Sequence, residues 1–93
     1  MKINDPRYED FTYLDKEVVF KELFLDKDYP IVQLHDATPC GDGIIGFCGV
    51  CSWINNELKA LDHDSYTPKM KVIAYSEFEH EGKICLDIIV TDW

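Results

Sequence analysis

The sequence predicts a small α+β domain in which one N-terminal helix packs on a mostly antiparallel sheet of about five strands. Apolar residues recur at helical spacing early in the chain, and they alternate with polar residues near its end. Stretches rich in Gly, Pro, Asn and Asp separate these segments. With 93 residues, the chain suits a single domain over 1–93, with residues 1–10 as an irregular N-terminal arm.

The helix is predicted from the segment LDKEVVFKELFLD, residues 14–26. Asp15 is a suitable N-cap, and Leu14 and Val19 occupy the two positions of a hydrophobic staple. The apolar residues that share one face at helical spacing are Val19, Phe20, Leu23 and Phe24. We expect this face to pack against the sheet.

The predicted strands cover residues 31–35, 45–54, 57–61, 70–78 and 84–91. The turn-rich stretches 37–43 and 63–69 read as loops. The last two strands form a hairpin, for which His80-Glu81-Gly82 suits a three-residue loop. Such a loop pairs Glu79 with Lys83, Phe78 with Ile84, Ser76 with Leu86, Ala74 with Ile88, and Val72 with Val90.

The segment FCGVCSWINN, residues 47–56, contains a CxxC pair with three possible interpretations. At a helix start, Cys48 and Cys51 would form a thioredoxin-like redox site, because a helix N-terminus lowers the pKa of a thiol. The chain from such a helix to Pro68 is too short for the rest of that fold. The second interpretation is a zinc site with ligands Cys40, Cys48, Cys51 and Cys85, joined by His35, His63 or His80. A second CxxC, which would strengthen this interpretation, is absent from the sequence.

The third interpretation, which we favour, is a strand that runs into a turn at Asn55-Asn56, since Asn tolerates a positive φ. This turn pairs Trp53 with Leu58, Cys51 with Ala60, Ile54 with Glu57, and Ser52 with Lys59. On a regular strand Cys48 and Cys51 point to opposite faces and cannot share a metal. A helix over residues 52–61 stays open, because Ile54, Leu58 and Leu61 also fit one helical face.

The charge balance narrows the class of partner. With 18 Asp and Glu against 9 Lys and Arg, the formal net charge is −9. This disfavours direct binding to nucleic acid or to an anionic membrane. The dispersed acids are typical of a soluble, solvated surface, and the sharper interpretation is an acidic face that docks on a protein partner with a basic surface. The first residues have no apolar run typical of a signal peptide, and no segment approaches the ~20 apolar residues of a membrane span. We expect a cytoplasmic location with reduced thiols.

Other chemical motifs are incomplete. Asp62-His63-Asp64 resembles part of a calcium loop without its Gly or distal Glu, so an Asx turn is favoured. The stretch GDGIIGFCG lacks the Lys-Ser/Thr ending of a phosphate loop. An enzyme is therefore not predicted, although a thiol enzyme stays open.

Aromatic residues suggest a binding surface, since the chain has five Tyr, five Phe and two Trp residues. The predicted partner-binding residues are Asp62, Asp64, Tyr66, Glu79, Glu81 and Trp93. We expect a non-catalytic acidic protein-binding module without a cofactor. Its composition is similar in kind to that of immunity proteins and of phage or mobile-element inhibitors that neutralise a basic enzyme. The alternative is a small zinc-binding protein with cysteine ligands.

Overall fold

The structure is a computed structural model that describes residues 6–37, 45–62 and 65–92. Its elements in chain order are the 3-10 turn η1 (Pro6–Tyr8), β1 (Thr12–Val19), α1 (Phe20–Leu23), β2 (Tyr29–Asp36), β3 (Gly46–Ile54), β4 (Glu57–Ala60), β5 (Lys71–His80) and β6 (Lys83–Asp92). Tyr8 of η1, within the segment expected to be irregular, is buried. Among these residues no helix has the length and apolar character needed to cross a membrane.

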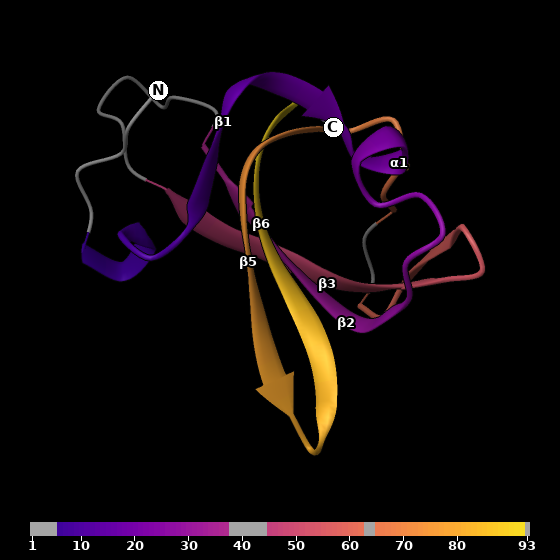
Figure 1. Cartoon of the computed structure of the whole chain (residues 1–93). Coiled ribbons are helices and arrows are strands. Elements are labelled where there is room, and N and C mark those ends of the chain that lie inside the picture. The colour runs from indigo at the N-terminus through magenta and orange to yellow at the C-terminus, as the bar shows by residue number, and fades with distance from the viewer. Residues whose placement is uncertain (1–5, 38–44, 63–64, 93) are drawn as a thin grey trace.

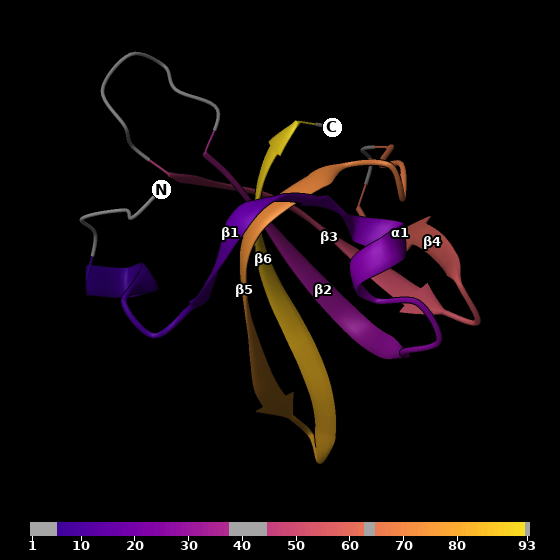
Figure 2. The same ribbon diagram turned by 45° about the horizontal axis from the view of Figure 1, so that its top comes forward.

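The six described strands form one sheet in the order β1-β5-β6-β2-β3-β4 (Figure 1). Every neighbouring pair is antiparallel except β2 and β6, which are parallel. The β5–β6 hairpin is long, and its loop end diverges from β2 and β3, as Figures 1 and 2 both show. The structure is thus a small sheet-dominated domain with one short helix, which fits the predicted α+β class.

The five predicted strands correspond to β2 through β6, but the predicted N-terminal helix is wrong. Its first six residues, 14–19, belong to β1, an edge strand against β5, and only Phe20–Leu23 is helical. Asp15 lies in β1 rather than at an N-cap, and the actual N-cap, Val19, makes no side-chain capping hydrogen bond. An isolated helix of about a dozen residues is marginal in water, so pairing with a sheet edge displaces it.

The main core cluster lies on one face of the sheet, where α1 covers it. Trp53 is at its centre: its indole N–H donates to the carbonyl oxygen of Phe24 over 2.9 Å. The Phe20 ring meets Trp53 edge-on, with 5.0 Å between the ring centroids. The members of the main cluster are Phe20, Phe24, Tyr29, Val32, Leu34, Cys51, Trp53, Met70, Val72, Leu86, Ile88 and Val90.

A second, smaller cluster includes Ile89, which follows Ile88 on β6 and therefore points to the other face of the sheet. Its buried members are Tyr8, Ile45, Ile73, Ala74 and Ile89. Because Tyr8 belongs to it, the segment before β1 covers part of this second face.

The β3–β4 hairpin confirms the predicted turn at Asn55-Asn56. Both asparagines have positive φ, 54° and 61°, and all four predicted cross-strand pairs are present. The alternative helix over residues 52–61 is therefore wrong. The backbone N–H of Asn55 also donates to Asp28 over 2.9 Å, which ties this turn to the loop after α1.

The β5–β6 hairpin has a two-residue loop, not the predicted three-residue loop. Glu81 and Gly82 both have positive φ, 52° and 77°, and His80 pairs with Lys83. Two positive φ values are typical of a type I′ turn, whose twist matches that of the strands. Near the loop the predicted register is therefore wrong by one residue, since the pairs are Glu79–Ile84, Phe78–Cys85, Glu77–Leu86, Ser76–Asp87, Tyr75–Ile88 and Ala74–Ile89.

Register shifts near the other end of β5 restore the predicted pair of Val72 with Val90. Between Val72 and Ala74, the strand β5 has one extra residue, Ile73, that has no counterpart on β6. This shift explains how the far end of the hairpin agrees with the prediction while the end near the loop does not.

Because Glu81 has a positive φ in the two-residue loop, we predict that Glu81→Asn stabilises the protein. A residue with a branched or long side chain pays about 1 kcal/mol or more for the left-handed region, where Asn is tolerated. We expect Glu81→Asn to raise the free energy of unfolding by about 0.5–1 kcal/mol in urea titrations. In Glu79→Asn, the matched change within the strand, we expect no gain. A loss of stability in Glu81→Asn would contradict the two-residue loop.

Candidate functional site

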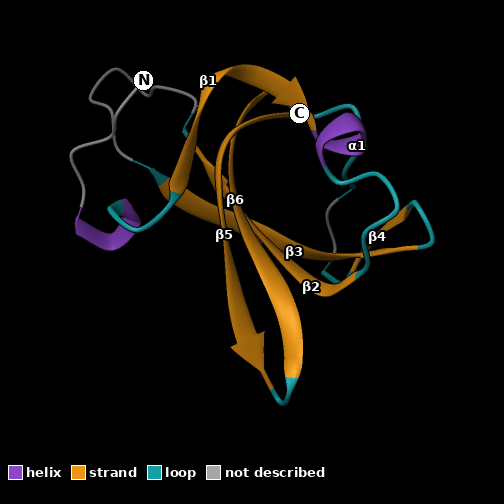
Figure 3. Cartoon of the chain, in the orientation of Figure 1, coloured by secondary structure: helices purple, strands orange, loops and turns teal. Residues whose placement is uncertain are grey.

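One projecting surface feature is the outer part of the β5–β6 hairpin, residues 76–85, which we call the free hairpin. On one side β1 pairs with β5 no further toward the loop than Tyr75, and on the other β2 pairs with β6 only from Leu86 onward. Within the described part of the chain, the free hairpin therefore has no third strand beside it. Figures 1 and 3 show that it projects beyond the rest of the sheet.

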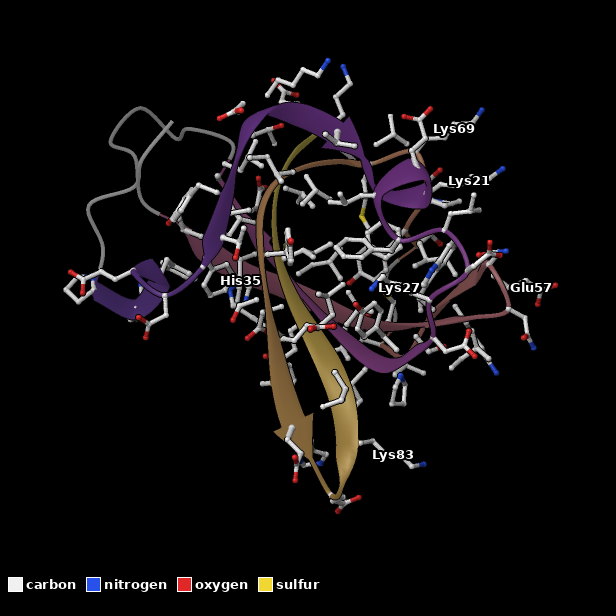
Figure 4. All side chains as sticks on the ribbon, in the orientation of Figure 1. Lys21, Lys27, His35, Glu57, Lys69 and Lys83 are labelled. Atoms are coloured by element: carbon white, nitrogen blue, oxygen red, sulfur yellow. The ribbon has the colours of Figure 1, made fainter. Side chains whose placement is uncertain are left out.

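The side chains of the free hairpin combine acidic charge with an exposed aliphatic group. Ile84 is 50% exposed and pairs directly with exposed Glu79. Glu81 in the loop is exposed as well. The bases nearby are His80, whose Nε2 lies 4.0 Å from Oε1 of Glu81, and Lys83 (Figure 4). The free hairpin thus carries three exposed glutamates, Glu77, Glu79 and Glu81, together with a half-exposed apolar side chain.

At the base of the free hairpin, Tyr29 fixes one of these glutamates. The Tyr29 hydroxyl donates to Oε2 of Glu77 over 2.7 Å, and Tyr29 itself is buried in the main cluster. Burial raises the pKa of Tyr29 well above its ordinary value, and the hydrogen bond to Glu77 adds to the rise. The hydroxyl therefore stays protonated and holds the Glu77 carboxylate in a defined position.

Two predicted site residues, Asp62 and Tyr66, lie together but have a structural role. Oδ2 of Asp62 accepts hydrogen bonds from the backbone N–H of Val50 and from the Tyr66 hydroxyl, each over 2.9 Å. Tyr66 also packs against the main cluster and lies directly over Gly49 of β3. Asp62 thus fastens the loop after β4 to the sheet.

The other predicted site residues fall elsewhere. Glu79 and Glu81 belong to the free hairpin, three strands away from the β3 edge that Asp62 contacts. With about 4.8 Å between neighbouring strands, this separation is on the order of 14 Å. Asp64 and Trp93 lie outside the described residues. Of the predicted contact residues that the structure describes, Asp62 lies with Tyr66, whereas Glu79 and Glu81 lie apart from them on the free hairpin.

The cysteines do not come together as the alternative zinc site requires within the described residues. Cys51 is buried in the main cluster, whereas Cys85 precedes Leu86 on β6 and points to the other side of the sheet. Cys40 lies outside the described residues. No three His, Cys, Asp or Glu side chains in the described ranges form a group that could hold a metal ion.

Cys48 differs from the expectation based on strand alternation. It is the extra residue of a bulge in β3, between Phe47, which pairs with His35, and Gly49, which pairs with Leu34. The bulge interrupts the alternation, and Cys48 packs against the same cluster that contains Cys51. Its Sγ donates to the carbonyl oxygen of Leu34 over 3.3 Å. The argument that alternation separates the two thiols is therefore wrong at this position.

His35 forms a polar cluster that the sequence did not reveal. Its Nδ1 lies 3.2 Å from the Tyr8 hydroxyl, and its Nε2 lies 3.4 Å from Oδ1 of Asp87. The rings of Tyr8, Phe11 and Phe47 surround the imidazole edge-on. Because Tyr8 belongs to the second cluster, these contacts fasten the segment before β1 to the sheet (Figure 4).

A second surface, which carries two lysines and so contrasts with the acidic free hairpin, lies beside α1. A hollow of about 440 Å³ is lined by Val19, Lys21, Glu22, Leu25 and Lys69. Leu25 is 53% exposed there, and Figure 4 shows Lys21 and Lys69 next to α1, well away from Lys83. This surface serves as a comparison region for measurements on the free hairpin.

The sequence indicated Glu79 and Glu81 correctly as exposed acids, but it missed the exposure of Ile84. The three-residue loop placed Ile84 opposite Phe78, within an apolar face expected to be buried. A signal for the correct register was available, because Glu81-Gly82 also fits a two-residue turn with Gly at the second position. That register places Ile84 beside Glu79 on the exposed end.

A substitution at Gly49 tests the structural role of Tyr66 and Asp62. A Cβ atom at Gly49 would overlap the Tyr66 hydroxyl, whereas a Cβ at Gly46 meets no atom within 4 Å. We expect Gly49→Ala to lower the free energy of unfolding by about 2 kcal/mol through overpacking. The matched control Gly46→Ala should change it by less than about 0.5 kcal/mol. Equal effects in urea titrations would contradict the close packing of Tyr66 on β3.

The burial of the Cys51 thiol leads us to predict a specific dependence of stability on pH. Burial raises the pKa of the Cys51 thiol to about 12, and the nearby Asp62 carboxylate adds to the rise. The same thiol in the unfolded chain has a pKa of about 8.5. Above that pH the free energy of unfolding therefore falls as the pH rises, by up to about 1.4 kcal/mol per pH unit. Between about pH 8.5 and 10, Cys51→Ala should lose less stability per pH unit than the wild type. Parallel curves for the two proteins would refute a buried, protonated Cys51.

Comparison of the chain with protein-family models, with curated proteins and with solved structures finds no match.

Proposed function

We propose that the chain is a non-catalytic protein-binding module that attaches to a basic partner through the free hairpin. One observation carries this proposal: half-exposed Ile84 lies beside Glu79 on a hairpin that no described strand covers. An exposed aliphatic group within a rim of charge is typical of the centre of a protein contact surface.

The apolar and charged groups would contribute in different ways. Covering the exposed half of Ile84 supplies about 1–2 kcal/mol of binding free energy. Glu79 and Glu81 speed the encounter with a basic surface and exclude acidic partners, because like charges repel at short range. The formal net charge of −9 adds a long-range attraction toward a basic partner.

This chemistry suits an inhibitor or immunity-type protein, of the style that phages or mobile elements use in the cytoplasm against a basic enzyme. An enzyme that binds nucleic acid presents clustered Lys and Arg to phosphate groups. An acidic hairpin with an apolar centre is complementary to such a surface and would compete with its substrate. The proposal therefore predicts inhibition of the partner as well as binding.

The test begins with capture of partners from a lysate of the native host on the immobilised chain, followed by Kd measurements with a purified captured protein. We expect Glu79→Lys with Glu81→Lys to weaken binding roughly 100-fold, and Ile84→Ala roughly tenfold. The wild-type affinity should fall as the salt concentration rises. Glu81 already has a positive φ, so replacing it with Lys adds no backbone strain.

The matched control is Glu9→Lys with Glu57→Lys, which changes the net charge equally at exposed positions outside the free hairpin. Figure 4 shows Glu57 on the β3–β4 hairpin, far from Lys83. We expect less than a roughly threefold change in Kd for this control. If both double variants weaken binding equally, net charge alone explains the effect and the free hairpin is not the contact surface. Unchanged Kd values for the free-hairpin variants would likewise overturn the proposal.

A further inference from the structure

We infer that the partner contributes an extended segment that adds to the sheet as a new strand along the outer edge of β5, over residues 76–80. This segment carries Lys or Arg at two alternate positions, which face Glu77 and Glu79, and an apolar residue between them, beside Phe78. The inference rests on the proposed function and specifies its mode of recognition.

The backbone of β5 is suited to this addition. In a hairpin with a two-residue loop, the residues that flank the loop form a hydrogen-bonded pair, here His80 and Lys83. Hydrogen bonding then alternates along the strand, so Phe78 and His80 bond to β6 while Glu77 and Glu79 direct their N–H and C=O groups outward. The paired part of β1 ends at Thr12 opposite Tyr75, so no described strand takes these outward groups.

The side chains on this edge define the pattern of the partner. Glu77 and Glu79 are two residues apart and share one face of the hairpin, on which the Tyr29 hydroxyl holds Glu77. Half-buried Phe78 lies on the opposite face. Residues directly opposite each other on paired strands have Cβ atoms about 5 Å apart, within reach of a charge pair. Two bases at alternate positions, with an apolar residue between them, satisfy both faces at once.

Charge also selects between a basic segment and a second copy of the chain. Antiparallel pairing of two such edges would place Glu77 and Glu79 of both copies on one face of the joined sheet. Like charges at opposed positions destabilise strand pairing, and acidic side chains on an edge are a known means of preventing self-association. The edge therefore disfavours a second copy and favours a basic strand.

The test uses the full ¹⁵N-labelled chain without substitutions and measures amide hydrogen exchange by NMR. The probe is a capped peptide of sequence Lys-Val-Lys-Val-Lys at millimolar concentration and low salt. In the free chain we expect the amides of Glu77 and Glu79 to exchange fast, while Phe78 and His80 are protected by β6. The peptide should slow exchange at Glu77 and Glu79 roughly tenfold or more, because both N–H groups then donate to its carbonyl oxygens.

Two peptides serve as controls. One has the same sequence with backbone N-methyl groups on its Lys residues, which removes the N–H groups that would face β5 without altering the charge. The other, Lys-Lys-Lys-Val-Val, has the same composition without the alternation. Neither should protect Glu77 and Glu79. Equal protection by the N-methylated peptide, or no protection by the alternating peptide, would overturn strand addition.

The outcome is distinguishable from failure of the proposed function. If charge reversal at Glu79 and Glu81 abolishes binding of a purified partner, while that partner leaves exchange at Glu77 and Glu79 unchanged, the free hairpin binds by its side chains alone. Strand addition is then wrong and the proposed function stands. If charge reversal leaves partner binding unchanged, the proposed function itself is wrong.

Discussion

The fold depends most on the burial of Trp53. Its indole N–H donates to the carbonyl oxygen of Phe24, and its ring lies against Phe20. On the sheet, Trp53 pairs with Tyr29 on one side and with Leu58 on the other, so one side chain joins β2, β4 and the segment around α1. A helix of four residues has no stability of its own, and this contact keeps it on the sheet.

The core so formed makes the free hairpin possible. An isolated two-stranded hairpin is at best marginally stable in water, and a protruding one needs an anchor. Here β6 supplies the anchor, because Leu86, Ile88 and Val90 are fully buried in the main cluster. The outer residues can then remain ordered while Ile84 stays exposed.

Local chemistry explains which parts of the structure the sequence predicted. Asn55-Asn56 determined the β3–β4 register, because both residues tolerate the positive φ that a two-residue turn requires. Glu81 has no such preference, so the sequence favours a three-residue loop with Gly82 as its left-handed residue, and the predicted register is shifted by one. That error hid Ile84, the main apolar residue of the candidate site. The helical pattern of residues 19–24 was real, but pairing with β5 is a tertiary contact that local periodicity does not reveal. The inward role of Asp62 likewise depends on Gly49 and Val50 of a different strand.

The central claim is that the free hairpin is the contact surface for a basic protein. Mapping of hydrogen exchange over the whole chain, with and without a purified partner, tests it most directly. The account predicts that new protection is concentrated in residues 76–85 and that the hollow beside α1, with Lys21 and Lys69, is unchanged. Protection centred on that hollow or on β4, with the free hairpin unaffected, would contradict it.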